Sequence, residues 1–177
     1  SAQYSGSVHL LDVATGEEIA KFTPSPLQER PNWQEVPSIS SIAFSPDSQH
    51  LAVGYITPIV IDAEQISARS VYIWDTETME PYFPDALSRM QLVVHSIAWT
   101  PSGKALAYGS NEGEIEIWDL QNDKLIWSAM EHDGRVMDLQ FSADGQRLAS
   151  GGEDKTINMW SASTGELLMT LNGHEYP

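Results

Sequence analysis

Apolar and polar residues alternate in short runs along this chain, and turn residues separate the runs. The clearest series lies in residues 134–171, where runs rich in β-branched and aromatic residues are punctuated by Gly145, Gly152 and Gly165. A period of two predicts strands, and glycines between the runs permit the positive backbone angles that tight turns need. The pattern therefore predicts four short strands joined by three tight turns, at residues 136–141, 147–150, 156–160 and 166–171.

The same four-strand unit recurs earlier in the chain. The aromatic that ends the first strand and the tryptophan that ends the third are 19 residues apart in two copies, Trp99 to Trp118 and Phe141 to Trp160. In the copy before them Trp74 follows Phe44 by 30 residues, so this copy carries 11 extra residues. The strands predicted for these copies are 39–44, 50–54, 71–74 and 79–83, then 92–99, 105–109, 114–118 and 124–127, and an incomplete pair precedes them at 8–12 and 18–22.

A proline indicates which strand of the unit lies at its edge. Pro81 falls inside the last strand of the first complete copy. Proline has no N–H to donate to a central ladder, so within sheets it is tolerated mainly on edge strands. The fourth strand is therefore predicted to be the outer edge of each unit.

Trp-Asp dipeptides end the third strand in two copies, at Trp74-Asp75 and Trp118-Asp119, and Trp160-Ser161 stands at the same place in the last copy. Gly173-His174 follows the final strand. The intervals of 44 and 42 residues between the three tryptophans are typical of four-stranded propeller blades. Over essentially its whole length, the chain resembles the Trp-Asp (WD) repeat β-propeller family.

This resemblance implies an all-β fold, a WD-repeat β-propeller present as a partial ring of three complete four-stranded blades plus two strands of another. The expected divisions are a half blade at 1–22, complete blades at 38–83, 92–128 and 134–171, and the start of a further repeat at 172–177. Both ends cut through a repeat. The chain therefore reads as a piece of a longer protein, in which the remainder of the propeller in the parent chain completes the ring.

The composition of the chain excludes several kinds of segment and site. No run of about 18 apolar residues is present, so no membrane span is predicted. The absence of cysteine excludes a disulfide framework, a thiolate metal site and a cysteine nucleophile, but leaves the compartment open between cytoplasm and exterior. The five histidines, at 9, 50, 95, 132 and 174, show no ligand spacing, and no calcium-loop motif occurs. No cofactor or metal is expected.

The net charge of the chain indicates which kinds of partner it can bind. The chain has 25 acidic and 9 basic residues, a net charge of −16, and no basic cluster. Such a surface repels a phosphate backbone, so direct nucleic-acid binding is not expected. The acidity is interpreted as a source of solubility, with an acidic docking face for a basic partner as the alternative.

The last blade contains every member of a serine-hydrolase triad, in His132, Ser150 and Asp154. No nucleophile elbow accompanies them. The WD-repeat resemblance implies a different role, in which His132, Ser150, Asp154 and Trp160 form a buried hydrogen-bonded chain that stabilises the blade. The structural interpretation is preferred to the catalytic one, so the chain is predicted not to be an enzyme.

The other blades depart from this pattern. The corresponding positions hold Met90, Tyr108 and Glu112 in the second complete blade, and Glu35, Val53 and Ala68 in the first. These blades are therefore expected to rely on apolar packing. The alternating Glu112, Glu114 and Glu116 could serve acid–base chemistry, but such alternation usually marks a solvated strand face, and that interpretation is preferred.

The resemblance implies a non-catalytic protein–protein interaction scaffold that binds other proteins through its loops. The alternative is an accessory or sensor propeller attached to a catalytic or signalling domain, or a propeller that binds a small ligand. In WD propellers the two insertions of the first complete blade, 23–37 and 55–70, would lie on one face. They are expected either to cover each other or to form a partner site. The candidate partner-binding residues are Trp33, Tyr55, Ile56, Ile59, Val60 and Ile61, with Arg135 and Glu153 in a polar rim.

Overall fold

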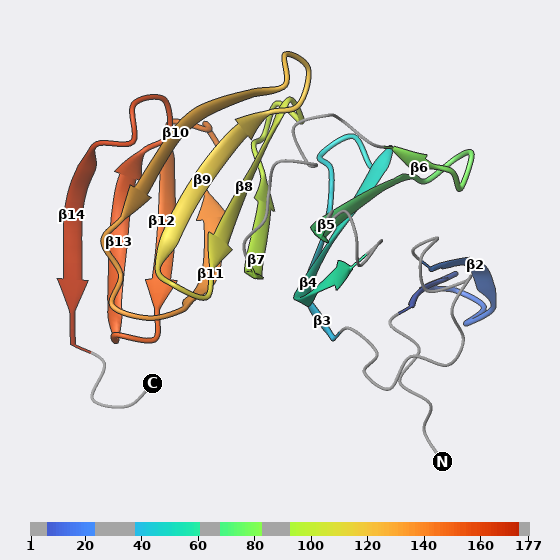
Figure 1. Cartoon of the computed structure of the whole chain (residues 1–177). Helices are drawn as coiled ribbons and strands as arrows, with labels where there is room; N and C mark the ends of the chain where they lie inside the picture. Colours follow the sequence, from blue (N-terminus) through green and yellow to red (C-terminus); the bar gives the residue numbers. More distant parts are fainter. Residues whose placement is uncertain (1–6, 24–37, 61–67, 83–92, 174–177) are drawn as a thin grey trace.

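The computed structural model describes residues 7–23, 38–60, 68–82 and 93–173, and it places the side chains of all of these except 57–60, 68 and 69. Within the described residues the regular structure is entirely β-strand (Figure 1). The predicted all-β class is therefore confirmed. No helix in this part of the chain is long and apolar enough to cross a membrane.

Twelve of the strands form three four-stranded antiparallel sheets, in which each strand pairs with the next one along the chain. Blade 1 contains β3 (Ile39–Phe44), β4 (His50–Val60), β5 (Ala68–Asp75) and β6 (Pro81–Tyr82). Blade 2 contains β7 (Val94–Trp99), β8 (Ala105–Ser110), β9 (Glu114–Asp119) and β10 (Lys124–Met130). Blade 3 contains β11 (Val136–Phe141), β12 (Arg147–Gly152), β13 (Thr156–Ser161) and β14 (Leu167–Asn172).

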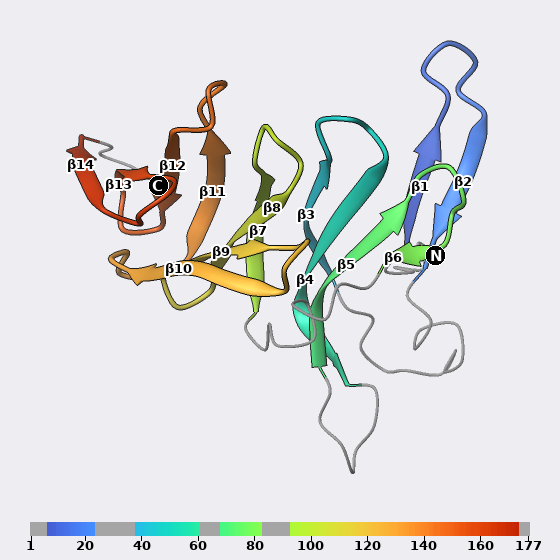
Figure 2. The same ribbon diagram turned by 90° about the horizontal axis from the view of Figure 1, so that it is seen from above.

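A two-stranded half blade, β1 (Val8–Leu11) and β2 (Glu18–Phe22), precedes blade 1. The first strands of the three complete blades, β3, β7 and β11, lie side by side, and the later strands spread outward from them (Figure 2). Half blade, blade 1, blade 2 and blade 3 thus follow one another in an arc. This arrangement agrees with the predicted partial propeller.

Apolar layers between neighbouring sheets hold the arc together. Along β7 the side chains alternate: Ile97 and Trp99 pack with blade 1, whereas Ala98 packs with blade 3. Because successive strand residues point to opposite faces, one strand can supply both layers. A third layer joins Phe22 of the half blade to Leu51 and Trp74 of blade 1. Each complete blade is thus one layer of a stack, and its stability depends on its neighbours.

Tryptophan side chains also bridge adjacent blades through their polar edges. The indole N–H of Trp99 donates to the Ala43 carbonyl at 3.0 Å, and that of Trp127 donates to the Ala162 carbonyl at 2.8 Å. Trp127 stacks on Trp160 of blade 3, with ring centroids 6.0 Å apart and planes inclined by 27°. These contacts combine apolar burial with a satisfied donor. They fix the register of one blade on the next.

The aspartate of the Trp-Asp dipeptide organises the turn that follows it. Asp75 Oδ1 accepts the N–H groups of Glu77 and Thr78 at 2.9 and 2.7 Å. Asp119 Oδ1 accepts those of Gln121 and Asn122 in the same way. The pKa of Asp75 is lowered chiefly by the bond from the Thr78 N–H, and the pKa of Asp119 chiefly by a bond from the side-chain amide of Asn122 to Oδ2, with the backbone bonds adding to it. The carboxylate mimics a backbone acceptor and closes the hairpin between the third and fourth strands.

The β4–β5 hairpin is longer than the sequence predicted. Strands expected at 50–54 and 71–74 extend to Val60 and back to Ala68, with an irregularity in the ladder between Gly54 and Ile59. The apolar run after Gly54 therefore lengthens the hairpin, and this hairpin projects beyond the other blades (Figure 2). Pro81 lies on β6, which pairs only with β5, as predicted for an edge strand.

Two faces of the arc carry exposed apolar side chains. On blade 1, Ile42 and Phe44 are 56% and 49% exposed, although their counterparts in blades 2 and 3 are buried. Among the described residues, the half blade has no first and second strands to cover them. On blade 3, Met169 and Leu171 of the outer strand are similarly exposed on the face turned away from blade 2.

Candidate functional site

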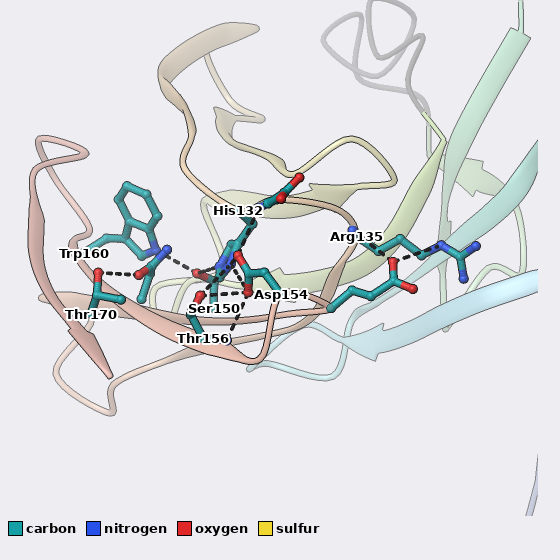
Figure 3. Close-up of polar contacts among 10 residues, drawn as sticks. His132, Arg135, Ser150, Asp154, Thr156, Trp160 and Thr170 are labelled. Atoms are coloured by element: carbon teal, nitrogen blue, oxygen red, sulfur yellow. Dashed lines mark hydrogen bonds and ion pairs between the residues drawn. The ribbon is translucent and has the colours of Figure 1, made fainter. Parts of the chain in front are cut away.

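The four residues singled out in the last blade come together as one hydrogen-bonded chain (Figure 3). The Trp160 indole N–H donates to Ser150 Oγ at 2.8 Å, and Ser150 Oγ lies 2.7 Å from His132 Nε2. His132 Nδ1 lies 3.0 Å from Asp154 Oδ2. In the tautomer that carries the ring proton on Nδ1, the Nδ1–H donates to the carboxylate and Nε2 accepts from the serine hydroxyl, which itself accepts the indole N–H. The polarity runs in one direction from Trp160 to Asp154.

The Asp154 carboxylate accepts further hydrogen bonds besides the one from His132. Its carboxylate accepts the Thr156 N–H at 3.0 Å, the Thr156 hydroxyl at 2.8 Å and the Asp133 N–H at 2.9 Å. Burial alone would raise the pKa of the carboxyl, but these bonds, from Thr156 first, lower the pKa to about 2. Asp154 therefore joins the β12–β13 turn to the segment that enters the blade from β10.

The surroundings of Ser150 and His132 can be compared with those that a catalytic serine and histidine need. A serine nucleophile must reach a substrate carbonyl, and its hydroxyl must be open on one side. Ser150 is 0% exposed, and its Oγ already accepts the indole N–H. His132 is also buried. A substrate could meet this serine only if the blade opened, so the arrangement is suited to holding strands together.

Blade 2 contains a polar cluster that the sequence interpretation missed. Tyr108 Oη and the Trp118 indole N–H both donate to Glu116 Oε2. The distance from the indole nitrogen of Trp118 to Oε2 is 2.5 Å. Burial, followed by the hydrogen bond to Glu116 and the negative charge there, raises the pKa of the Tyr108 hydroxyl. Tyr108 and Trp118 do lie in the buried apolar layer, as expected for this blade, but their polar atoms share an acceptor that the expectation did not include. Glu116 is a half-buried acceptor for two donors, not simply part of a solvated face.

The neighbouring glutamates behave differently from Glu116. Glu112 is exposed in the β8–β9 turn, whereas Glu114 is half-buried at the start of β9. Burial, with repulsion from Glu116 and Glu112, raises the pKa of Glu114. Blade 1 does rely on apolar contacts at the corresponding place, since Val53 and Trp74 lie in its buried layer with Phe22. Met90 and Glu35 lie outside the described residues.

The predicted partner-binding residues of blade 1 have mixed outcomes. The prediction that Tyr55 offers an exposed binding surface is wrong, since this side chain is 0% exposed and packs edge-on against Tyr72. The lengthened strand turns it into the apolar layer between blade 1 and the half blade. Ile56, on the opposite side of β4, is 37% exposed. Ile59 and Val60 pair with Arg69 and Ala68 in the projecting hairpin. Trp33 and Ile61 lie outside the described residues, as do the segments needed to place the two insertions side by side.

Arg135, which is labelled in Figure 3, lies beside Glu153, and both side chains are exposed. Arg135 Nε is 3.7 Å from Glu153 Oε2, and it donates to Asn111 Oδ1 at 3.0 Å. Asn111, which the sequence interpretation did not single out, comes from the β8–β9 turn of blade 2. The three residues therefore link blades 2 and 3 at the face where the first strands begin. We call them the polar rim cluster.

The chain folds into successive four-stranded antiparallel sheets whose first strands lie side by side, and a tryptophan stands near the end of each third strand. These features define a β-propeller of the WD-repeat class. A family model described as the first β-propeller of IFT140 matches residues 27–176, so the chain belongs to this family of propellers. Within the described residues, no group of three or more His, Asp or Glu side chains is placed to hold a metal ion.

The chain is also similar to parts of several curated proteins. The chain is 33% identical over 120 residues, 64% of its length, to Topless-related protein 4 of Arabidopsis thaliana. It is 30% identical over 156 residues, 81% of its length, to the chromatin assembly factor 1 subunit FAS2 homolog of Oryza sativa subsp. japonica. It is 32% identical over 128 residues, 72% of its length, to the APC/C activator protein CDC20 of Saccharomyces cerevisiae. These matches span only 11%, 29% and 19% of the relatives' own lengths.

Proposed function

We propose that this chain is part of a non-catalytic interaction scaffold, and that a protein partner docks on the face bearing the polar rim cluster and the β4–β5 hairpin. The observation that carries the proposal is the convergence of these parts. Arg135 and Asn111 join two blades at the β8–β9 turn, and the corresponding connection of blade 1 is the β4–β5 hairpin, which projects beyond the other blades (Figure 2). A rigid set of blades presenting exposed loops on one face is well suited to recognition.

The chemistry of this face suits a mixed contact. Ile56 offers exposed apolar surface, and arginine is enriched among residues that contribute most to protein interfaces. The names of two relatives, a chromatin assembly factor subunit and an APC/C activator, are those of proteins that act with other proteins. We propose no nucleic-acid contact for this chain, because its net charge of −16 opposes one. Trp33, Ile59, Val60 and Ile61 remain candidates for the same face.

His132, Ser150, Asp154 and Trp160 have a supporting role in this proposal. Their hydrogen bonds tie the segment that precedes Arg135 to the β12–β13 turn that carries Glu153. Loss of the network would therefore displace Arg135 and Glu153, the two members of the polar rim cluster that blade 3 contributes. The proposed role is to hold the docking face in shape, without a chemical step.

Affinity capture with the 177-residue chain as bait tests the proposal. Arg135→Glu should release a protein that the unaltered chain retains, with only a small loss of melting temperature, because the contacts of Arg135 to Asn111 and Glu153 are exposed. Arg147→Glu is the matched control, because Arg147 is an exposed arginine at the start of β12, at the opposite end of blade 3. Equal loss with both variants would indicate a non-specific charge effect, and retention with Arg135→Glu would contradict the proposed face.

A further inference from the structure

The turn between the first and second strands contains an aspartate in two of the three complete blades. In blade 1 Asp47 Oδ1 accepts the Ser45 hydroxyl at 2.6 Å and the Gln49 N–H at 3.0 Å. Its counterpart in blade 3, Asp144, accepts the corresponding hydroxyl and N–H at 2.5 and 2.9 Å. These bonds, the one from the hydroxyl first, lower the pKa of both carboxyl groups. The turn therefore favours an anion at this position.

Blade 2 has an exposed serine, Ser102, at this position of the turn. Its Oγ lies 3.2 Å from Thr100 Oγ1 and accepts the N–H of Lys104 over 3.4 Å. Both distances are longer than the matching ones in blades 1 and 3. The turn of blade 2 thus has the same hydroxyl and N–H donors as its neighbours, but it lacks the anion that these donors favour.

The residue two positions further along the turn differs in the complementary way. Blades 1 and 3 have the neutral Gln49 and Gln146 there, whereas blade 2 has Lys104, which is exposed. An anion at position 102 would therefore meet a cation two residues away as well as the two donors. A phosphate on Ser102 Oγ would bring three acceptor oxygens, and these would reach one bond further from the backbone than the oxygens of an aspartate.

We propose that Ser102 is a site of phosphorylation by a protein kinase, and that its phosphate occupies the anion position that Asp47 and Asp144 fill in the neighbouring blades. In the transfer, Ser102 Oγ loses its proton to the base of the kinase and bonds to the γ-phosphorus of ATP, while the bond from that phosphorus to ADP breaks. The phosphate then accepts from the Thr100 hydroxyl and from the N–H and ammonium groups of Lys104.

The turn that carries Ser102 lies between the corresponding turns of blades 1 and 3. A Cβ placed on Gly103 would be 3.7 Å from Pro46 Cδ, and one placed on Gly145 would be 3.4 Å from Pro101 Cδ. Phosphorylation would change this middle turn from cationic to anionic, beside two turns that already hold an aspartate. The turn precedes β8 and the β8–β9 turn of the polar rim cluster follows it, so the modified end is opposite to the proposed docking face and is independent of it.

Substitution in the full 177-residue chain tests the anion position. Ser102→Asp should melt about 1–2 °C higher than Ser102→Asn, which has the same shape without the charge. Lys104→Gln, which supplies the residue of the neighbouring turns, should reduce this difference. Equal melting temperatures of the two variants at position 102 would overturn the proposal.

A chain prepared with phosphoserine at position 102 gives a second measurement. In a ³¹P NMR titration, the pKa of the second ionisation of the phosphate should be lower in the folded chain than in the same chain unfolded in urea, because the donors and the Lys104 ammonium favour the dianion. Lys104→Gln should raise the folded value. Equal pKa values in the two states would overturn the proposal.

The modification itself is tested on the protein isolated from its native cells with phosphatases inhibited. Mass spectrometry of the tryptic peptide that ends at Lys104 should locate a phosphate on Ser102. Ser96 and Thr100 are internal controls in the same peptide, because their hydroxyls donate to backbone carbonyls. A peptide found only without phosphate, or with the phosphate on Thr100, would overturn the proposal.

Discussion

At the scale of single residues, one carboxylate closes each of two polar clusters. In blade 3 Asp154 ends the chain that starts at Trp160, and in blade 2 Glu116 accepts from both Tyr108 and Trp118. Each indole N–H is buried and can only donate, so each needs an acceptor nearby. Blades 2 and 3 meet the same requirement with different residues.

Asp154→Ala should lower the free energy of unfolding by about 1–3 kcal/mol, because it leaves His132 and two backbone N–H groups without their acceptor. Urea unfolding followed by tryptophan fluorescence measures the change. Asp133→Ala is the control, since it removes an exposed carboxylate and keeps the N–H that bonds Asp154. Equal stabilities of the two variants would contradict a stabilising network.

The same pair of proteins has a defined pH dependence. The pKa of Asp154 is lowered from 3.8 to about 2 in the folded state, so its contribution to stability is present above pH 4. The contribution is lost as the pH falls toward 2, where the carboxylate is protonated in both states. The gap in melting temperature between the unaltered chain and Asp154→Ala should therefore narrow over this range. A gap that stays constant from pH 5 to pH 2 would contradict the assignment.

Glu116→Ala should destabilise the chain by about 1–3 kcal/mol, because Tyr108 Oη and the Trp118 N–H would lose their common acceptor. Glu112→Ala, in the exposed turn before β9, should change the stability by less than about 0.5 kcal/mol. Thermal unfolding of both variants checks the difference. Similar small effects would show that Glu116 belongs to a solvated face after all.

These residues also show what the sequence could predict about the site. The residues of the blade 3 network could be named in advance, because a known type of residue stands at each repeat position. Glu116 was missed, since a glutamate that alternates with isoleucines gives the same pattern on a wet face and beside two buried donors. Tyr55 was placed wrongly, because the apolar run around it does not reveal which side of the strand meets a neighbouring sheet.

At the scale of strands, three of the predicted ranges agree with the structure at both ends. The ranges 18–22, 39–44 and 136–141 match β2, β3 and β11 to the residue. The hairpin of β4 and β5 was underestimated, because a long insertion gives no turn signal near the end of either strand. The packing of one blade on the next depends on side-chain contacts between sheets, and local alternation does not reveal which residues meet.

Gly109→Ala should destabilise the chain by about 1–3 kcal/mol, because a Cβ there would lie 2.5 Å from Val136 Cγ1 and 2.8 Å from Ser96 Oγ. Gly151→Ala is the matched control at the same position of blade 3, where a Cβ would have nothing within 4 Å. Chemical unfolding of the 177-residue chain should show a large loss for the first variant and almost none for the second. Equal losses would mean that strand flexibility, not contact between blades, sets the requirement.

At the scale of the whole molecule, the arc ends in two uncovered apolar faces. Ile42 and Phe44 lie on the face of blade 1 turned away from blade 2, and Met169 and Leu171 lie on the face of blade 3 turned away from blade 2. Propellers usually have four to eight blades, and each relies on its neighbours for burial. The 177 residues on their own are therefore expected to be only marginally stable. A cooperative, stable monomer in a thermal melt would contradict this expectation.

Replacing both Ile42 and Phe44 by serine should lower the binding of the dye ANS to the 177-residue chain with little loss of melting temperature, because these side chains are already 56% and 49% exposed. Leu139→Ser with Phe141→Ser, the buried counterparts in blade 3, should instead unfold that blade. Dye fluorescence and thermal melting on the same samples check both outcomes. Equal destabilisation by the two pairs would mean that the blade 1 face is covered in solution.

The stacked indoles of Trp127 and Trp160 lie on opposite sides of the contact between blades 2 and 3. Two such chromophores at 6.0 Å couple their electronic transitions, so their circular dichroism is a property of the pair and not of either ring. The signal disappears if the blades part, even when every strand keeps its own hydrogen bonds. The circular dichroism of this tryptophan pair therefore reports whether blades 2 and 3 are in contact, without an added label.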